Sequence, residues 1–276
     1  MATGAPSSTA PSSPLKWRRS ARRLTEGQAT LLRDAFRDVQ AIGDDRGYSY
    51  FAGIHGLPRP IGCDNAHGQP YFLPWHRAYL YFFERALRDR VPDATLPWWD
   101  WRRPDIPALF ADEFGADGQP NPLFSASVDP QALAQGQQAG PPLDSVLATT
   151  ERDPGAPGTP RLPSAVEVAD VLGRGDFIDF SFALEDLHNR VHVWVGGRFG
   201  HMQYIEFAAF DPIFWAHHSM VDRIWRIWQL RHPGSLPPRA LLDDALPPFR
   251  MTVEQTLDVE ALGYDYAAST ASQVTA

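Results

Sequence analysis

The histidines of this 276-residue chain fall into two groups that could hold metal ions. One group lies between residues 55 and 76 and the other between residues 188 and 232, with more than a hundred residues free of histidine between them. The nine are His55, His67, His76, His188, His192, His201, His217, His218 and His232. Imidazoles gathered in this way predict metal binding more strongly than histidines scattered along a chain.

His188 and His192 have a spacing that suits chelation. On a helix, residues four apart lie on the same face, one turn from each other. An isolated pair would more often be a surface feature, but here the neighbours between 191 and 195 are valines and a tryptophan. Buried neutral imidazoles need partners, and a metal ion would satisfy both. His76 and His218 also fall on apolar helix faces, where each alone would be interpreted as a core histidine.

The side chains available as ligands limit which metal ions could bind. Neither a cysteine cluster nor a group of carboxylates accompanies the histidines, and all-imidazole sites suit copper, zinc, iron or nickel. A catalytic zinc needs only three protein ligands. Two groups of three therefore indicate two metal ions, and two copper ions would leave open positions facing each other for O₂. A dizinc hydrolase is the less favoured alternative, because such sites normally include bridging carboxylates.

Helices must position these side chains. Apolar periodicity and capping signals predict them over residues 25–42, 48–55, 74–90, 164–172, 180–194 and 211–230. Between them, residues 103–163 are rich in Pro, Gly, Ala and Gln and predict a long excursion over the surface. We expect residues 1–16 and 267–276 to be tails, and residues 17–266 to form one domain.

Composition bounds the function classes. A net charge of −8 argues against a nucleic-acid binder, and no apolar run reaches the length of a membrane span. The single Cys63 excludes an intramolecular disulfide. The arginine pairs 18–19 and 22–23 superficially match a twin-arginine signal but precede an amphipathic helix. We therefore expect a cytoplasmic protein, secreted only with a partner.

Five segments resemble the motifs of the tyrosinase and catechol oxidase family of type-3 dicopper proteins. They are residues 67–84 (HGQPYFLPWHRAYLYFFE), 97–101 (PWWDW), 187–197 (LHNRVHVWVGG), 211–225 (DPIFWAHHSMVDRIW) and 262–266 (LGYDY). The resemblance covers about residues 17–266 and implies a mainly α fold, with a central antiparallel four-helix bundle around two copper ions.

Carried over by position, the resemblance assigns the ligands. Copper A would be held by His55, His67 and His76, and copper B by His188, His192 and His218. His217 would be a non-ligand neighbour, His201 a loop residue, and His232 has no assigned role. The resemblance further implies that Phe214 stacks over the copper B histidines, that Asp222 orients His218 as a hydrogen-bond acceptor, and that Met202 lies in the entrance loop.

The resemblance also implies a proton acceptor for monophenols. In the family a Glu, with an Asn directly after the first copper B histidine, holds a water thought to take the phenol proton. Glu185 and Asn189 match these positions. A helix N-terminal charge is the alternative interpretation of Glu185, and Asp179 or Asp186 could take its place.

The function that the resemblance implies is a copper-dependent phenol oxidoreductase. It would use O₂ to hydroxylate monophenols and to oxidise o-diphenols to o-quinones, as a tyrosinase does. A catechol oxidase or an o-aminophenol oxidase would carry much the same signature, and a hemocyanin-like oxygen carrier is a less favoured alternative. The expected partners are O₂, a small phenol and a copper chaperone or carrier protein.

Overall fold

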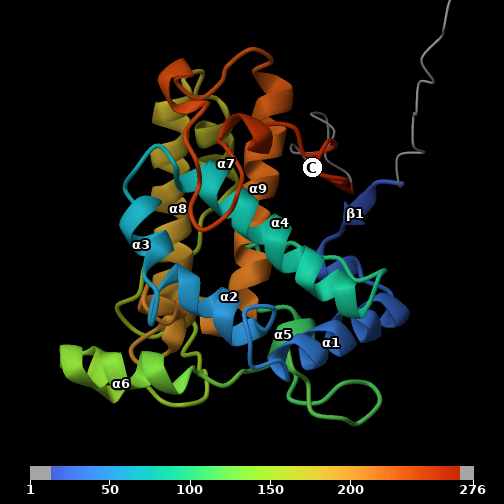
Figure 1. The fold of residues 1–276 in the computed structure, drawn as a ribbon, viewed down its shortest axis with the longest axis vertical. Coiled ribbons are helices and arrows are strands. Elements are labelled where there is room, and N and C mark those ends of the chain that lie inside the picture. The colour runs from blue at the N-terminus through green and yellow to red at the C-terminus, as the bar shows by residue number, and fades with distance from the viewer. Residues whose placement is uncertain (1–13, 268–276) are drawn as a thin grey trace, which may run out of the picture.

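The computed structural model describes residues 14–267, which form a mainly helical fold (Figure 1). The helices are α1 (Glu26–Gln40), α2 (Tyr48–His55), α3 (Ile61–Asn65), α4 (Phe72–Arg90), α5 (Ala108–Ala111), α6 (Pro130–Ala139), α7 (Ala165–Leu172), α8 (Phe177–Gly196) and α9 (Ile213–Arg231). The two strands are β1 (Lys16–Arg18) and β2 (Tyr264–Tyr266). The expected mainly α fold class is confirmed.

Three long helices form the centre of the molecule. Figure 1 shows α8 and α9 running side by side, with α4 crossing them, and residues of α4, α8 and α9 contact one another pairwise. Their inner faces are apolar and fully buried, as Leu80, Val191 and Ile224 illustrate. Burial of such faces supplies most of the stability of a helical core, because isolated helices of this length are marginal in water.

Local signals explain where the helices begin. Thr25 caps α1 through a capping box with Gln28, and Ser164 caps α7 in the same way with Glu167. The expected starts of the two long helices were too late: α4 begins at Phe72, and α8 begins at Phe177 after its Asp176 cap.

The Pro- and Gly-rich segments contain more helix than expected. α3 lies in the region taken as a loop between residues 56 and 72, and α6 lies inside the 103–163 excursion. Asp129 and Pro130 begin α6 as N-cap and first helical residue, a signal that a purely periodic search does not detect. This segment, residues 103–163, is called the excursion below. It is also packed into the core, because Leu123 and Val128 are buried.

The two ends of the described chain meet in a small parallel sheet. Lys16 pairs with Tyr264 and Arg18 with Tyr266. Lys16 was assigned to the N-terminal tail and belongs instead to β1, because its backbone completes this pairing. Most of the two expected tails, residues 1–13 and 268–276, lies outside the described residues.

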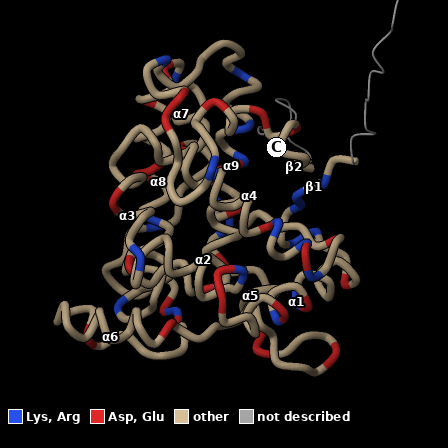
Figure 2. Tube along the Cα trace, in the orientation of Figure 1, with Lys and Arg blue, Asp and Glu red and all other residues tan. Residues whose placement is uncertain are grey.

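Charged residues do not gather in one region of the described chain. Figure 2 shows acidic and basic residues interspersed over the fold. Within residues 14–267, no helix has both the length and the apolar character that crossing a bilayer would demand.

Candidate metal centre

Two clusters of histidine side chains lie in the centre of the helical core. The A cluster is His55, His67 and His76, and the B cluster is His188, His192, His217 and His218. In each cluster, one nitrogen from every ring lies within 4.8 Å of the others, a spacing that can hold a metal ion. His67 is half-buried, and the other six histidines of the two clusters are buried.

The A cluster is assembled from three separate segments. His55 is the last residue of α2, His67 lies in the turn after α3, and His76 lies in the second turn of α4. The Nε2 atoms of His55 and His67 are 3.1 Å apart. Nε2 of His76 is buried without a hydrogen-bond partner in the described structure, so it is available to a metal ion.

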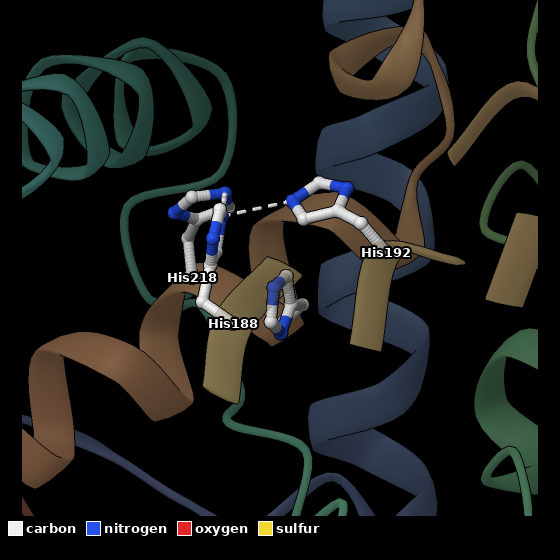
Figure 3. Close-up of side chains that lie close together, drawn as sticks. His188, His192 and His218 are labelled. Carbon is white, nitrogen blue, oxygen red and sulfur yellow. Dashed lines mark hydrogen bonds between the residues drawn. The ribbon is translucent and has the colours of Figure 1, made fainter. Parts of the chain in front are cut away.

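The B cluster comes from two facing helices, α8 and α9. Nε2 of His188 lies 2.9 Å from Nε2 of His192 and 3.2 Å from Nε2 of His218 (Figure 3). His217 stacks on the His188 ring, with centroids 4.9 Å apart and planes at 15°. His217 had been expected to stand outside the ligand set, and the structure places it inside the cluster.

Most of these imidazoles are held through Nδ1. A carbonyl oxygen can only accept, so Nδ1 carries the proton where it lies beside one. His76 donates to Phe72 of its own helix at 2.8 Å, His192 to Met202 at 2.8 Å, and His55 to Ile205 at 3.2 Å. This tautomer leaves the Nε2 lone pair for a metal, which is the arrangement that outer hydrogen bonds usually impose on metal-binding histidines.

Burial keeps the rings neutral. Removal from water lowers the pKa of His55, His76, His188 and His218 well below the usual value for histidine, and neighbouring imidazoles lower it further. The pKa of His192 falls to about 3, again chiefly because of burial. Neutral imidazole is the form that binds metal, so these pKa shifts favour metal binding at physiological pH.

The two clusters face each other. The rings of His76 and His218 are stacked with centroids 4.3 Å apart and planes at 13°, and they come from opposite clusters. Phe214 lies over this junction, 4.2 Å from the His218 ring and 4.8 Å from the His55 ring. Two metal ions held here would therefore be neighbours.

Glu185 and Asn189, the candidate residues for proton removal, contact His67 and His188 from α8. Glu185 sits in the middle of α8, not at its N-terminus, so its interpretation as a helix-terminal charge is wrong. Its carboxylate accepts from Gly68 N–H at 2.8 Å and lies 3.3 Å from Nδ1 of His67. The Asn189 side-chain oxygen lies 3.0 Å from Nδ1 of His188. Asp179 and Asp186 are exposed, and Asp179 pairs with Arg174.

Asp222 does not hold His218, contrary to our expectation. Its carboxylate accepts instead from Arg77, Arg18 and the hydroxyls of Tyr264 and Tyr266. In the described structure, Nδ1 of His218 has no hydrogen-bond partner. Four competing donors turn the Asp222 carboxylate towards α4 and the small sheet. Asp222 therefore fixes the position of α9, and acts on His218 only through the helix.

A cavity of about 190 Å³ leads from the surface to the histidines. Its walls are His67, His188, Asn189, His192, Val193, Met202, Gln203 and Ile205. Asn189 and Val193 are exposed, whereas Met202 is completely buried. A larger cleft of about 640 Å³ lies between the excursion and Trp194, and no described histidine lines it.

The remaining histidines have protein partners. His232 caps the C-terminus of α9 and lies 2.9 Å from the carbonyl of Leu172 through Nε2. His201 is fully buried in the 3₁₀ turn η3 (His201–Gln203), which follows α8. Sequence reasoning left both without a role, and their apolar or Gly-rich surroundings gave no signal of the backbone contacts they make.

Comparisons with known proteins agree with this geometry. Residues 45–231 match the model of the common central domain of tyrosinase. The chain is 35% identical over 243 residues to a tyrosinase of Streptomyces glaucescens, covering 77% of this chain and 84% of that protein. It is 30% identical over 287 residues to hemocyanin 2 of Megathura crenulata, covering 88% of this chain and 8% of that much longer protein.

A solved structure extends the likeness to three dimensions. The functional unit of octopus hemocyanin superposes with a TM-score of 0.74 at 28% identity, covering 94% of this chain and 71% of that one.

Proposed function

The chain belongs to the tyrosinase family of type-3 copper proteins, and we propose that it is a phenol oxidase that hydroxylates monophenols and oxidises o-diphenols to o-quinones with O₂. His55, His67 and His76 would hold one copper ion, and His188, His192 and His218 the other. Copper bound there would supply O₂ activation and accept the electrons of the phenol. The fit is supported by neutral rings whose Nε2 atoms turn inward in two adjoining clusters.

The cavity beside the clusters is the observation that carries this proposal. It exposes edges of His67, His188 and His192 to an opening lined by Asn189 and Val193. An oxygen carrier needs access only for O₂, whereas an oxidase needs a passage for an aromatic ring. A cavity of about 190 Å³, walled by imidazoles, apolar side chains and two amides, with no carboxylate or Lys or Arg side chain among the described residues that line it, suits a small neutral phenol.

Asn189 and Glu185 would assist removal of the phenol proton. A phenol must lose this proton before its oxygen can bind copper, so an acceptor is needed close to the cavity. Asn189 lines the cavity, and the Glu185 carboxylate lies one turn of α8 away, beside His67. A water held between these two side chains would take the proton from the phenol hydroxyl.

An oxygen carrier is the second candidate, and the hemocyanin relatives favour it. The chain spans only 8% of hemocyanin 2 and 71% of the octopus unit, so those similarities concern the dicopper core alone.

Oxygen uptake by the copper-loaded protein tests the proposal. The substrates would be a monophenol, its matching catechol and an o-aminophenol, with copper and zinc content measured on the same sample. We expect uptake with the monophenol and the catechol. Uptake with catechol or o-aminophenol alone would restrict the activity to that of a catechol or aminophenol oxidase. Reversible O₂ binding with no turnover would identify a carrier, and zinc in place of copper would refute both.

A further inference from the structure

We propose that His201 is a positioning residue for the B cluster: it fixes the turn whose Met202 carbonyl orients His192. This inference rests on the proposed copper site, but it does not depend on which reaction takes place there. His201 lies outside both clusters and is completely buried.

Both ring nitrogens of His201 bind the backbone of the excursion. Nδ1 accepts from the Glu151 N–H at 3.0 Å, and Nε2 donates to the Leu147 carbonyl at 2.9 Å. The backbone of His201 also bonds to Glu151, because its N–H donates to the Glu151 carbonyl at 3.1 Å. The tautomer with its proton on Nε2 satisfies both ring bonds. Neither nitrogen is left for a metal ion, so His201 is not a ligand.

Met202, the next residue, connects this turn to the B cluster. The Met202 carbonyl accepts from Nδ1 of His192 at 2.8 Å, which fixes the ring and turns Nε2 towards His188. The turn can reach α8 because residue 196 is glycine: a Cβ there would collide with the backbone nitrogen of Gln203. Met202 therefore keeps its position only while the turn is pressed against α8.

The excursion is a fixed support for this turn. Asp153 and Gly155 donate their N–H groups to the carbonyls of Val195 and Trp194, at the C-terminal end of α8. Arg152 makes a two-pronged ion pair with the fully buried Asp211, directly before α9. His201 thus joins η3 to a segment that is attached to both helices of the B cluster.

The A cluster is attached to the same segment, but three residues after Met202, where a further backbone contact supports it. Its residue His55 is held by the carbonyl of Ile205, and the adjoining Glu206 carbonyl accepts from Leu57 N–H at 2.9 Å. Loss of His201 should therefore loosen His192 more than His55. A difference between the two metal sites is the effect that distinguishes positioning from general destabilisation.

The test compares His201→Leu, which removes both ring contacts, with His201→Asn, which keeps an acceptor for Glu151 N–H. His232→Leu is the matched control, because His232 also contacts a backbone carbonyl through Nε2 but lies at the far end of α9. We would follow removal of copper by a chelator in each protein, and measure thermal unfolding without copper. Loss of an outer hydrogen-bond partner typically weakens metal binding about 10- to 100-fold.

We expect one of the two copper ions to bind about 10- to 100-fold more weakly in His201→Leu, with an intermediate loss in His201→Asn. The control should keep both affinities whatever its thermal stability. Nitrogen NMR of the copper-free protein should also show His192 losing its fixed Nδ1–H tautomer in His201→Leu. Equal weakening of both ions, unchanged binding of both, or an unchanged His192 tautomer would overturn the inference. A wild-type protein that binds two copper ions but oxidises no phenol would refute the proposed function alone.

Discussion

Within the described structure, His217 differs from the other cluster histidines because neither of its ring nitrogens has a hydrogen-bond partner. Both of its ring nitrogens are buried without a hydrogen bond in the described structure. A buried polar atom left unpaired costs about 1–3 kcal/mol. His217 packs between His188 and Trp101, whose ring centroid lies 5.7 Å away. The structure therefore presents four candidate ligands for the B ion, where the family resemblance implies three.

Copper stoichiometry separates these two possibilities. We expect His217→Leu to retain two copper ions per chain, because His188, His192 and His218 suffice for one ion, and His218→Leu to retain one. Metal analysis after dialysis against a weak chelator measures this. If the His217→Leu protein retained a single copper ion, His217 would be a ligand of the B ion.

Asn189 is exposed and lines the cavity beside the clusters. We expect Asn189→Leu to lower turnover of a monophenol by at least about tenfold more than turnover of its catechol, because proton removal by a positioned base contributes about 10²- to 10⁴-fold. Initial rates with both substrates give the ratio. Asn189 also contacts His188, so copper content must be measured in parallel. Equal losses on both substrates at full copper content would contradict the role.

At the scale of elements, Arg18 ties the small sheet to two helices that carry histidines. Its guanidinium donates to Glu84 of α4 and Asp222 of α9, and lies over the Tyr264 ring. Although burial opposes ionisation of Asp222, Arg77 and Arg18 outweigh it and hold the pKa of that carboxyl below its usual value. Arg77 and Arg88 also pair with these two carboxylates, but full compensation of both needs Arg18 of β1.

Removal of Arg18 should therefore destabilise the whole core. We expect Arg18→Met to lower the free energy of unfolding by about 3–5 kcal/mol, because it leaves two buried carboxylates short of a partner. Lys16→Met, in the same strand, is the control: its exposed pair with Asp93 should contribute little. Urea unfolding of the copper-free proteins measures both. Similar losses in the two variants would mean that β1 acts through its backbone pairing rather than through Arg18.

At the scale of the whole molecule, burying so many neutral imidazoles makes stability depend on pH. The folded-state pKa values lie below the unfolded value of about 6.5, and that of His192 is about 3. The unfolded chain therefore binds more protons as the pH falls, and stability decreases. For His192, the stability that comes from burying a neutral ring is fully present above about pH 6.5 and is lost between there and about pH 3.

We expect the copper-free protein to lose about 1.4 kcal/mol per pH unit below 6.5 for each cluster histidine that stays neutral. Urea unfolding at pH 8, 6 and 5 measures the slope. Asp222 has little effect on a slope measured between pH 8 and 5, because its pKa is lowered from an already acidic 3.8. A flat profile from pH 8 to 5 would contradict the burial of neutral rings.

Much of the local structure and the types of metal-binding side chain could be predicted from contiguous residues. The capping box at Thr25, the apolar faces of α4 and α9, and the i, i+4 spacing of His188 and His192 are properties of contiguous residues, so they could be recognised without a fold. The start of α6 at Asp129-Pro130 was equally local and was missed because the segment lacks apolar periodicity.

The hydrogen-bond partners of side chains far apart in the chain could not be predicted in this way, because they depend on the fold. The contacts of Asp222 with Arg18, Arg77 and two tyrosines, and those of His201 with Leu147 and Glu151, join residues separated by tens to hundreds of positions. A hydrogen bond depends on direction and on competition among donors, and neither is encoded in spacing along the chain. For this reason the candidate histidines could be identified from the sequence, whereas the groups that hold each ring in place could be identified only from the fold.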